Sequence, residues 1–409
     1  MLDIQKIREN PQAIKAAVEA KGFAADAVDQ VLAVDQTRRK LIQEIDGIRA
    51  QKNKLTKEDV EQGKKLKAAL KEQEDALRQS DEAYERLMLQ IPNPSAPDVV
   101  VGSPDKNQIV KTVGAPPSFS FPVRDHVDIG LATNTIDIER GTKIAQSGFY
   151  YMKGAGALLE FALVSYAMHK LTEQGFVPVI TPNVAKERNV VGCGFQPRSD
   201  KERQIYHIQD EDLDLIATAE ITLVGQHTDE ILDESILPLR YAGFSSCYRT
   251  EAGSYGKDVR GILRVHEFRK VEMVVFCTPE ESDAWHEKLL AIEESIWQDM
   301  KIPYQVVKMA TGDLGSAATR KYDIEAWMPS QNKYREVTST SNTTDFQARR
   351  LNIRTKGKAG NRYAHTLNGT VLALGRAIIA IYENCQQQDG SVRIPDVLAP
   401  YMHGVTKIG

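Results

Sequence analysis

The first hundred residues carry an apolar repeat every seven positions. Val34, Leu41, Ile48 and Leu55 fall seven residues apart, and after a short break a second series starts at Leu70. Such a repeat predicts helices that pack along a narrow apolar seam. Two of these helices joined by a short turn form an antiparallel coiled-coil hairpin, and about 30 residues per helix at roughly 1.5 Å per residue give an arm of about 45 Å.

Apolar runs with strand spacing begin after a stretch rich in proline. The two longest, 244–251 and 265–276, enclose a glycine-rich, charged turn and predict a long antiparallel hairpin. Strands and helices lack the regular alternation of a parallel sheet, so the sequence favours an α+β fold on an antiparallel sheet. We expect a helical domain over 1–100, a linker over 101–125 and the α+β domain over 126–409.

Charged and aromatic side chains alternate along this hairpin. With a strand period of two, Arg249 and Glu251 share one face of the first strand. The second strand presents four more side chains on one face: His266, Phe268, Lys270 and Glu272. A guanidinium, carboxylates and an aromatic ring on one side suit a ligand with phosphate, amine and a flat base. The solvent face of an exposed hairpin shows the same alternation, so this stretch alone leaves both interpretations open.

The overall charge excludes a generally basic nucleic-acid binder. Lys and Arg number 52 against 56 Asp and Glu, so any nucleic-acid contact must come from a local patch. The four cysteines lie far apart, which predicts no zinc site and fits a reducing, cytoplasmic compartment. The start of the chain resembles neither a secretory signal nor a transit peptide. The apolar run 371–382 is too short to span a membrane and contains Arg376.

A local basic patch lies at the predicted tip of the arm. Between Arg49 and Lys71 the basic residues exceed the acidic ones by five, whereas the root of the second helix is acidic. Backbone recognition of a nucleic acid requires a patch of this kind. Taken alone, these charges favour an ordinary solvated coiled-coil surface over a nucleic-acid contact.

Two segments of the hairpin resemble the second signature motif of class II aminoacyl-tRNA synthetases, in the form typical of seryl-tRNA synthetases. Their sequences are YRTEAG at 248–253 and RVHEFRKVE at 264–272. Motif 1 of the same class resembles residues 155–182, which are expected to form a helix and then a strand that ends in proline. Motif 3 resembles residues 365–376, which lead into the helix expected over 371–386. The resemblance covers nearly the whole chain. It implies a class II catalytic domain on an antiparallel sheet, preceded by a tRNA-binding N-terminal domain with a coiled-coil helical arm.

Between motifs 1 and 2, an apolar strand expected over 215–220 ends in Thr-Ala-Glu and resembles the serine-binding signature of the seryl enzymes. A capping Thr followed by a Glu that opens a helix gives the same letters. By the resemblance, serine would be bound by Thr218, Ala219, Glu220, Arg249, Glu272 and Thr370.

The resemblance also implies an ATP site. ATP would be bound by Arg249, Thr250, Glu251, Val265, His266, Glu267, Phe268, Glu336, Val337, Thr338, Ser339 and Arg376. Arg249 and Arg376 would be the catalytic residues, the first at the α-phosphate and the serine carboxylate, the second at the γ-phosphate. Phe268 would stack on adenine, with Glu251 near its amine.

A magnesium ion shared with the phosphates is expected at Glu336 and Ser339, because a carboxylate and a hydroxyl suit a hard cation. Spacing of three does not put these residues on one face of a regular strand. Their joint role requires a β-bulge, which the sequence does not reveal. Most Glu and Ser pairs of this kind in strands are surface residues.

Basic residues in two places are expected to contact tRNA. They are Arg49, Lys52, Lys54, Lys57, Lys64, Lys65 and Lys67 on the arm, and Lys257 and Arg260 in the hairpin loop. Val259 stands in this loop where Thr is common in the family, which leaves the acceptor-end contacts open. Thr370 stands where many bacterial relatives have Ser and keeps the hydroxyl.

These features lead us to expect an ATP-dependent ligase that forms seryl-adenylate and transfers serine to the 3′ end of tRNA(Ser). We further expect a homodimer through motif 1, Mg²⁺ as cofactor, and no zinc. Whether tRNA(Sec) is charged as well stays open. One alternative is a paralogue that loads a carrier protein, but such relatives lack the arm and use a zinc-bound site. Another is a silent coiled-coil binding protein, which would have lost Arg249, Glu272 or Arg376.

Overall fold

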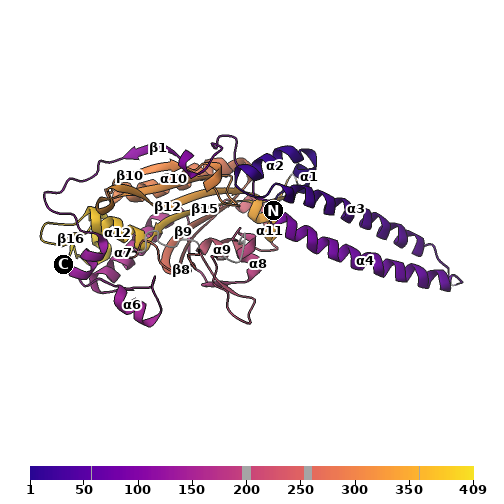
Figure 1. The fold of residues 1–409 in the computed structure, drawn as a ribbon, viewed down its shortest axis with the longest axis horizontal. Helices are drawn as coiled ribbons and strands as arrows, with labels where there is room; N and C mark the ends of the chain where they lie inside the picture. Colours follow the sequence, from indigo (N-terminus) through magenta and orange to yellow (C-terminus); the bar gives the residue numbers. More distant parts are fainter. Residues whose placement is uncertain (57, 196–203, 253–259, 359) are drawn as a thin grey trace. The chain divides into compact units, whose positions relative to one another are not determined.

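The structure, a computed structural model, describes residues 1–409 except 57, 196–203, 253–259 and 359. Contacts divide the chain into two compact units, Met1–Ser95 and Ala96–Gly409 (Figure 1). Among the described residues, no helix is both long and apolar enough to cross a membrane.

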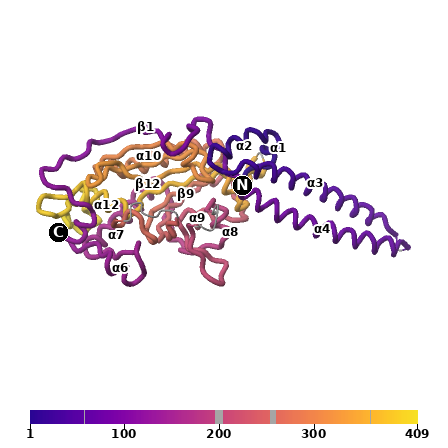
Figure 2. The backbone as a smooth tube through the Cα atoms, viewed as in Figure 1, coloured from indigo at the N-terminus to yellow at the C-terminus, as the bar shows by residue number. Residues whose placement is uncertain are grey.

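Helices form the first unit. They are α1 (Ile4–Glu9), α2 (Pro11–Ala20), α3 (Asp26–Lys52) and α4 (Val60–Met88). The last two run antiparallel, as Figure 2 shows, and ion pairs cross between them from Arg38 to Asp81 and from Arg49 to Glu74. The predicted coiled-coil arm is therefore confirmed.

An eight-stranded sheet forms the centre of the second unit. In spatial order its strands are β1 (Gln108–Val113), β10 (Tyr304–Lys308), β11 (Arg320–Met328), β12 (Lys333–Thr344), β15 (His365–Ala373), β9 (Glu267–Cys277), β8 (Leu239–Tyr248) and β4 (Val177–Ile180). Neighbours are antiparallel except β4 and β8. The predicted α+β fold is confirmed. The predicted hairpin is β8 and β9, with Leu239 opposite Phe276 and Tyr248 opposite Glu267.

Alternate residues of β9 pack into two different hydrophobic clusters. Val271, Met273 and Val275 belong to the main core, which includes residues of α7 (Gly154–Glu173), α10 (Ser282–Asp299) and α12 (Leu374–Asn384). Val274 and Phe276 pack instead with residues of α8 (Glu187–Gly192), α9 (Ala219–Gly225) and α11 (Phe346–Leu351). The period of two therefore directs Val274 and Phe276 away from the main core.

Shorter elements complete the second unit. The helices are α5 (His126–Ala132) and α6 (Ile138–Ile144). Three two-stranded sheets pair β2 (Ile136–Asp137) with β3 (Tyr151–Met152), β5 (Val184–Ala185) with β6 (Asp214–Leu215), and β16 (Val392–Arg393) with β17 (Lys407–Ile408). A three-stranded sheet joins β7 (Ile231–Asp233), β13 (Arg354–Gly357) and β14 (Gly360–Tyr363).

Element boundaries differ from the sequence expectations in several places. The segment 101–125, expected as a linker, contains β1, an edge strand exposed along most of its length and so without a buried, alternating face. The helix expected over 371–386 begins only at Leu374, because β15 continues to Ala373. A buried apolar run is compatible with either a strand or a helix, so the sequence could not separate the two. Arg376 consequently lies on the first turn of α12. The strand expected over 215–220 is shorter, since β6 ends at Leu215 and α9 begins at Ala219.

Candidate active site

A cavity opens beside β9, β12 and the end of β15. This first cavity is lined by Arg249, Glu251, Ile262, Leu263, Arg264, Val265, Phe268, Lys270, Glu336, Val337, Thr338, Ser339, Thr370, Ala373, Gly375 and Arg376. It brings together the ends of the hairpin, the middle of β12 and the first turn of α12. Residues from three separate sequence motifs thus meet in one place.

A β-bulge lets Glu336 and Ser339 line the same cavity. Across β11 and β12, Ile324 faces Thr338 while Glu325 faces Glu336, so Val337 is an extra residue. One extra residue shifts the alternation and turns side chains three apart toward the same face. The structure therefore supplies the bulge that a joint role of Glu336 and Ser339 requires.

Positive charge surrounds the Glu336 carboxylate. Its oxygen lies 3.3 Å from the Arg376 guanidinium, which also donates to the Glu336 carbonyl at 2.9 Å. Burial acts to raise the pKa of Glu336, but the charges of Arg376, Lys321 and Arg249 outweigh it and lower this pKa to about 2. Glu336 is therefore an ionised carboxylate at neutral pH, as a cation ligand must be.

A second cavity adjoins the first and shares Arg249, Lys270, Ser339 and Thr370 with it. Its lining adds Cys193, Gly194, Phe195, Thr218, Glu220, Glu272, Asp313, Leu314, Gly315, Ser316, Ala317, Ala318, Lys321, Ser341, Thr343 and Asn368. The expected serine-binding residues Thr218, Glu220 and Glu272 are among these additional residues, and Arg249 and Thr370 are among the four shared ones.

Lys270, Glu272 and Thr370 form a buried polar cluster between the cavities. Lys270 Nζ donates to Glu272 Oε2 at 2.6 Å and to Thr370 Oγ1 at 3.3 Å. Thr370 Oγ1 in turn donates to Glu272 Oε2 at 3.0 Å. Only 2% of the Glu272 side chain and 8% of the Lys270 side chain are exposed. These contacts arise because Phe268, Lys270 and Glu272 share a face of β9, as the alternation predicted, and Thr370 lies opposite Glu272.

Glu220 is a second buried carboxylate facing this region. Its Oε1 accepts hydrogen bonds from Gln347 Nε2 at 2.6 Å and from Asn368 Nδ2 at 2.9 Å. Burial and the charge of Glu272 raise the pKa of Glu220 to about 7. Thr218 caps α9 by accepting the Glu220 N–H at 3.3 Å. Thr218 is therefore the helix cap that the sequence allowed, and both Thr218 and Glu220 also line the second cavity.

Glu251 reaches the first cavity by an unexpected route. The sequence placed it with Arg249 on one face of a regular strand, but β8 ends at Tyr248 and Glu251 has a left-handed φ of 53°. An ion pair with Arg264 orients its carboxylate. The Arg249 guanidinium lies 5.2 Å from the centre of the Phe268 ring, so a cation and an aromatic face meet at this wall.

Four expected site residues are placed elsewhere. Thr250 donates its N–H to the Gln204 carbonyl. His266 stacks on Phe149 with ring centres 5.5 Å apart, and its Nδ1 lies 3.0 Å from the Tyr206 hydroxyl. Glu267 lines a separate groove, whose other residues include Ile144, Phe161 and Ile180. Ala219 is buried in the cluster formed with α8 and α11.

The basic residues expected to contact tRNA divide into two groups. Those on the arm are exposed: Arg49, Lys52, Lys54, Lys64, Lys65 and Lys67. Two of them have acidic partners, Glu74 for Arg49 and Glu61 for Lys64. Arg260 pairs with Asp125 at 2.6 Å and with Asp128 at 2.8 Å, so a phosphate would compete with two carboxylates there. Lys57 and Lys257 lie outside the described residues, as does Val259.

The sequence alone assigned no role to four residues of this region: Arg264, Lys270, Gln347 and Asn368. Of these, only Lys270 was placed on the correct face of its strand. Lys270 could have been found from its spacing of two from Phe268 and Glu272. Gln347 and Asn368 reach Glu220 from positions more than a hundred residues away, and no local pattern indicates such contacts.

Comparison with known proteins matches both units. Residues 1–95 match the family "Seryl-tRNA synthetase N-terminal domain", and residues 204–385 match the "tRNA synthetase class II core domain (G, H, P, S and T)". The serine–tRNA ligase of Rubrobacter xylanophilus is 46% identical, over 98% of this chain and 98% of its own length. That of Dictyoglomus turgidum is 46% identical, over 100% of this chain and 99% of its own.

Solved structures of seryl-tRNA synthetases are similar to this chain over its full length. The seryl-tRNA synthetase from Pyrococcus horikoshii complexed with ATP superposes with a TM-score of 0.93 at 39% identity, covering 100% of this chain and 99% of that chain. The cytoplasmic serine–tRNA ligase from Naegleria fowleri in complex with AMP superposes with a TM-score of 0.89 at 32% identity, covering 100% and 98%. Given this similarity over the full length, the chain belongs to the seryl-tRNA synthetases, the ATP-dependent ligases that join serine to tRNA.

Proposed function

We propose that the two cavities form one active site, in which ATP activates serine to seryl-adenylate before the transfer to tRNA. The observation that carries this proposal is the buried cluster of Lys270, Glu272 and Thr370, which lies beside Arg249 where the cavities meet. A cavity lined by expected serine-binding residues is thus continuous with one lined by expected ATP-binding residues. The ATP and AMP of two similar structures support a nucleotide in the first cavity.

Serine is recognised through its charged and polar groups. Glu220, on the wall of the second cavity, accepts the ammonium group, and Arg249 holds the carboxylate. Glu272 and Thr370 accept and donate hydrogen bonds to the side-chain hydroxyl, in place of part of the contact they make with each other. A buried site built for a hydroxyl disfavours alanine, because alanine leaves these groups without a partner.

Activation needs positioning and charge stabilisation more than acid or base catalysis. The serine carboxylate is already a nucleophile, so a serine oxygen forms a bond to the α-phosphorus while the bond from that phosphorus to the bridging oxygen of pyrophosphate breaks. Arg249 stabilises charge at the α-phosphate, and Arg376 holds the γ-phosphate of the leaving group. Phe268 stacks on the adenine ring and Glu251 accepts from its amine.

The residues of the first cavity fit a magnesium ion. Glu336 is ionised and Ser339 lies on the same wall through the Val337 bulge, so a carboxylate and a hydroxyl would hold the ion. Bound there with the phosphates, magnesium would neutralise part of the charge of the departing pyrophosphate.

Serine binding should weaken as the pH falls through about 7. Glu220 has a raised pKa of about 7, so below that pH it is protonated in the free enzyme and cannot pair with an ammonium group. We expect the KM for serine in ATP–pyrophosphate exchange to rise several-fold between about pH 7.5 and 6. The Glu220→Gln variant should show a high KM with a flatter pH dependence, and a wild-type KM that is constant over this range would contradict the role of Glu220.

A homodimer is expected through the surface near motif 1. Ile180 on the edge strand β4 is 88% exposed and Phe161 on α7 is 68% exposed, and both line one groove with Ile144. Exposed apolar patches of this kind indicate an interface. We expect sedimentation to show a dimer at micromolar concentration and Ile180→Asp to shift it to monomer. Ile109→Asp, on the opposite edge strand β1, is the matched control and should stay dimeric; a monomeric wild type would refute the dimer.

The exposed basic residues of the arm are proposed to bind tRNA(Ser) through its phosphate backbone. The cysteines at 193, 247, 277 and 385 are free thiols, which supports a reducing, cytoplasmic location.

Trapping the intermediate tests the proposed reaction. The enzyme is incubated with radiolabelled serine, ATP and Mg²⁺ in the absence of tRNA, with pyrophosphatase present, and separated by gel filtration. The label should elute with the protein and pass to added tRNA(Ser), and EDTA during the incubation should prevent both. Label that reaches tRNA only when serine, ATP and tRNA are mixed together would exclude a stable adenylate.

A further inference from the structure

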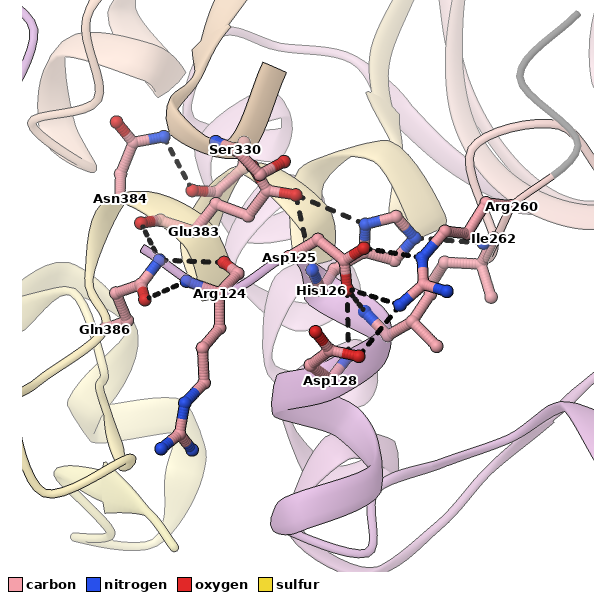
Figure 3. Close-up of polar contacts among 12 residues, drawn as sticks. Arg124, Asp125, His126, Asp128, Arg260, Ile262, Ser330, Glu383, Asn384 and Gln386 are labelled. Atoms are coloured by element: carbon pink, nitrogen blue, oxygen red, sulfur yellow. Dashed lines mark hydrogen bonds and ion pairs between the residues drawn. The ribbon is translucent and has the colours of Figure 1, made fainter. Parts of the chain in front are cut away.

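His126 joins parts of the second unit that lie far apart in the sequence (Figure 3). It is the first residue of α5 and is 3% exposed. On one side, its Nδ1 lies 3.2 Å from Oε1 of Glu383 in α12, and its backbone N–H donates to the same oxygen at 3.3 Å. On the other side, the Ile262 N–H donates to its Nε2 at 3.2 Å. The imidazole therefore links α12 to the segment 261–265.

These contacts determine which ring nitrogen carries the proton. A backbone N–H can only donate, so Nε2 of His126 must be the bare acceptor for Ile262. Nδ1 then carries the proton and donates it to the Glu383 carboxylate. The other oxygen of Glu383 accepts the Ser330 N–H at 3.0 Å, so the carboxylate is fixed from two directions. A ring in this state is neutral, and its orientation is set by partners on both sides.

The segment approaches the ring too closely for any side chain. Gly261 has a left-handed φ of 82°, and a Cβ at this position would lie 1.9 Å from His126 Nε2. No other residue fits without moving the segment or the ring. The hydrogen bond from Ile262 is thus part of a close contact between backbone and imidazole.

This segment forms a wall of the first cavity. Ile262, Leu263, Arg264 and Val265 all line it, and Arg264 holds Glu251 by an ion pair. Anything that fixes Ile262 therefore fixes the wall against which a nucleotide would bind.

We propose that His126 is a positioning residue for the nucleotide site: held by Glu383, it accepts the Ile262 N–H at Nε2 and thereby fixes the cavity wall formed by 261–265. The inference rests on the proposed function of the first cavity. It concerns a residue that is not among those lining either cavity.

Surface ion pairs offer a competing explanation for the position of this segment. Arg260, which precedes it, pairs with Asp125 and Asp128 of the same α5 region (Figure 3). The Arg260 side chain is 63% exposed, so solvent screens these pairs and their contribution is small. The buried hydrogen bond to His126 is screened far less. Asp128→Asn removes the negative charge of one exposed ion pair and leaves the imidazole in place, which makes it the matched control.

The test compares His126→Ala, His126→Gln and Asp128→Asn in serine-dependent ATP–pyrophosphate exchange. Loss of a buried acceptor predicts a rise of roughly 5- to 100-fold in the KM for ATP of His126→Ala. The KM for serine should stay within about twofold, because Glu220 and Glu272 line the second cavity, whereas the segment lines the first. In His126→Gln the amide can donate to Glu383 and accept from Ile262, so its KM for ATP should return toward the wild-type value. Asp128→Asn should match the wild type.

A purely structural role gives a different pattern. It would lower the melting temperature and the active fraction of His126→Ala and leave its KM for ATP within twofold of the wild type, which would overturn the proposal. A His126→Gln variant as impaired in ATP binding as His126→Ala would also overturn it. If the wild type itself shows no serine-dependent exchange, the proposed function fails instead.

The tautomer of His126 can be measured in the wild-type protein without an activity assay. Nitrogen-15 spectra of protein labelled at histidine distinguish a ring protonated at Nδ1 from one protonated at Nε2, and His126→Gln identifies the signals of His126 by their loss. We expect a neutral ring with the proton on Nδ1. A proton on Nε2 would exclude the hydrogen bond from Ile262 and with it the positioning role.

Discussion

Replacing Glu272 by Gln should lower the kcat/KM for serine in ATP–pyrophosphate exchange by roughly 10²- to 10⁴-fold. Glu272 is almost fully buried and accepts hydrogen bonds from Lys270 and Thr370. Removing one partner of a buried charge pair costs about 3 to 5 kcal/mol, and each 1.4 kcal/mol is a factor of ten. The substitution keeps the shape of the side chain but leaves the Lys270 ammonium without its counter-charge and the serine hydroxyl without an ionised acceptor.

Matched variants separate loss of recognition from loss of fold. Glu272→Asp keeps the charge and should retain more activity than Glu272→Gln, and both should keep the circular dichroism of the wild type. ATP binding, measured without serine, should change little, because Glu272 lines the second cavity and Arg376 lines the first. Serine exchange within tenfold of the wild type in Glu272→Gln would show that this carboxylate does not select the substrate.

Shortening the arm should abolish efficient tRNA charging and leave serine activation nearly unchanged. Removal of 51–72 keeps the Arg49–Glu74 ion pair as the new end of the coiled coil, so both shortened helices stop at the same level. Packed helices lie about 8–10 Å apart, a distance that a four-residue turn can span. The deletion takes away Lys52, Lys54, Lys64, Lys65 and Lys67 together. The kcat/KM for tRNA(Ser) should fall by two orders of magnitude or more, roughly the effect of losing several phosphate contacts.

A charge variant tests whether phosphate contacts cause this loss. The variant replaces Lys64, Lys65 and Lys67 together by Gln. It should reduce the slope of log KM for tRNA against log salt concentration by about 2 to 3. Lysines on a helix read the backbone and shape of A-form RNA, whose deep major groove hides the base edges. Lys40→Gln, on α3 and paired with Glu44, is the control and should leave the slope unchanged. Charging by the shortened enzyme at low tRNA concentration would show that the arm is only structural.

Periodic features of the sequence predicted most of the architecture. The seven-residue repeat gave α3 and α4, and the period of two placed Phe268, Lys270 and Glu272 on one face of β9. Both signals are local, because each depends only on the geometry of one helix or strand. The helix start at Leu374 could not be located, since Val371 to Ala373 are apolar in a strand as they would be in a helix.

The assembly of the site depended on features that no local pattern encodes. The Val337 bulge, which turns Glu336 and Ser339 to one side, is visible only in the pairing of β12 with β11. Arg260 was expected to be available to tRNA, but its carboxylate partners Asp125 and Asp128 lie more than 130 residues earlier. Glu251 and Arg264 meet because the chain leaves the strand after Tyr248. Irregular backbone and distant ion pairs arise from the tertiary fold.

Substrate selection is the central claim, and exchange kinetics with all twenty amino acids test it most directly. The enzyme, ATP, Mg²⁺ and labelled pyrophosphate are mixed with each amino acid in turn, and kcat/KM is compared. A site in which Glu272 and Thr370 bind a hydroxyl should favour serine over alanine by roughly 10⁴-fold or more. Threonine, which keeps the hydroxyl and is refused by size alone, should be the less strongly rejected. Exchange with alanine or proline as fast as with serine would contradict the claim.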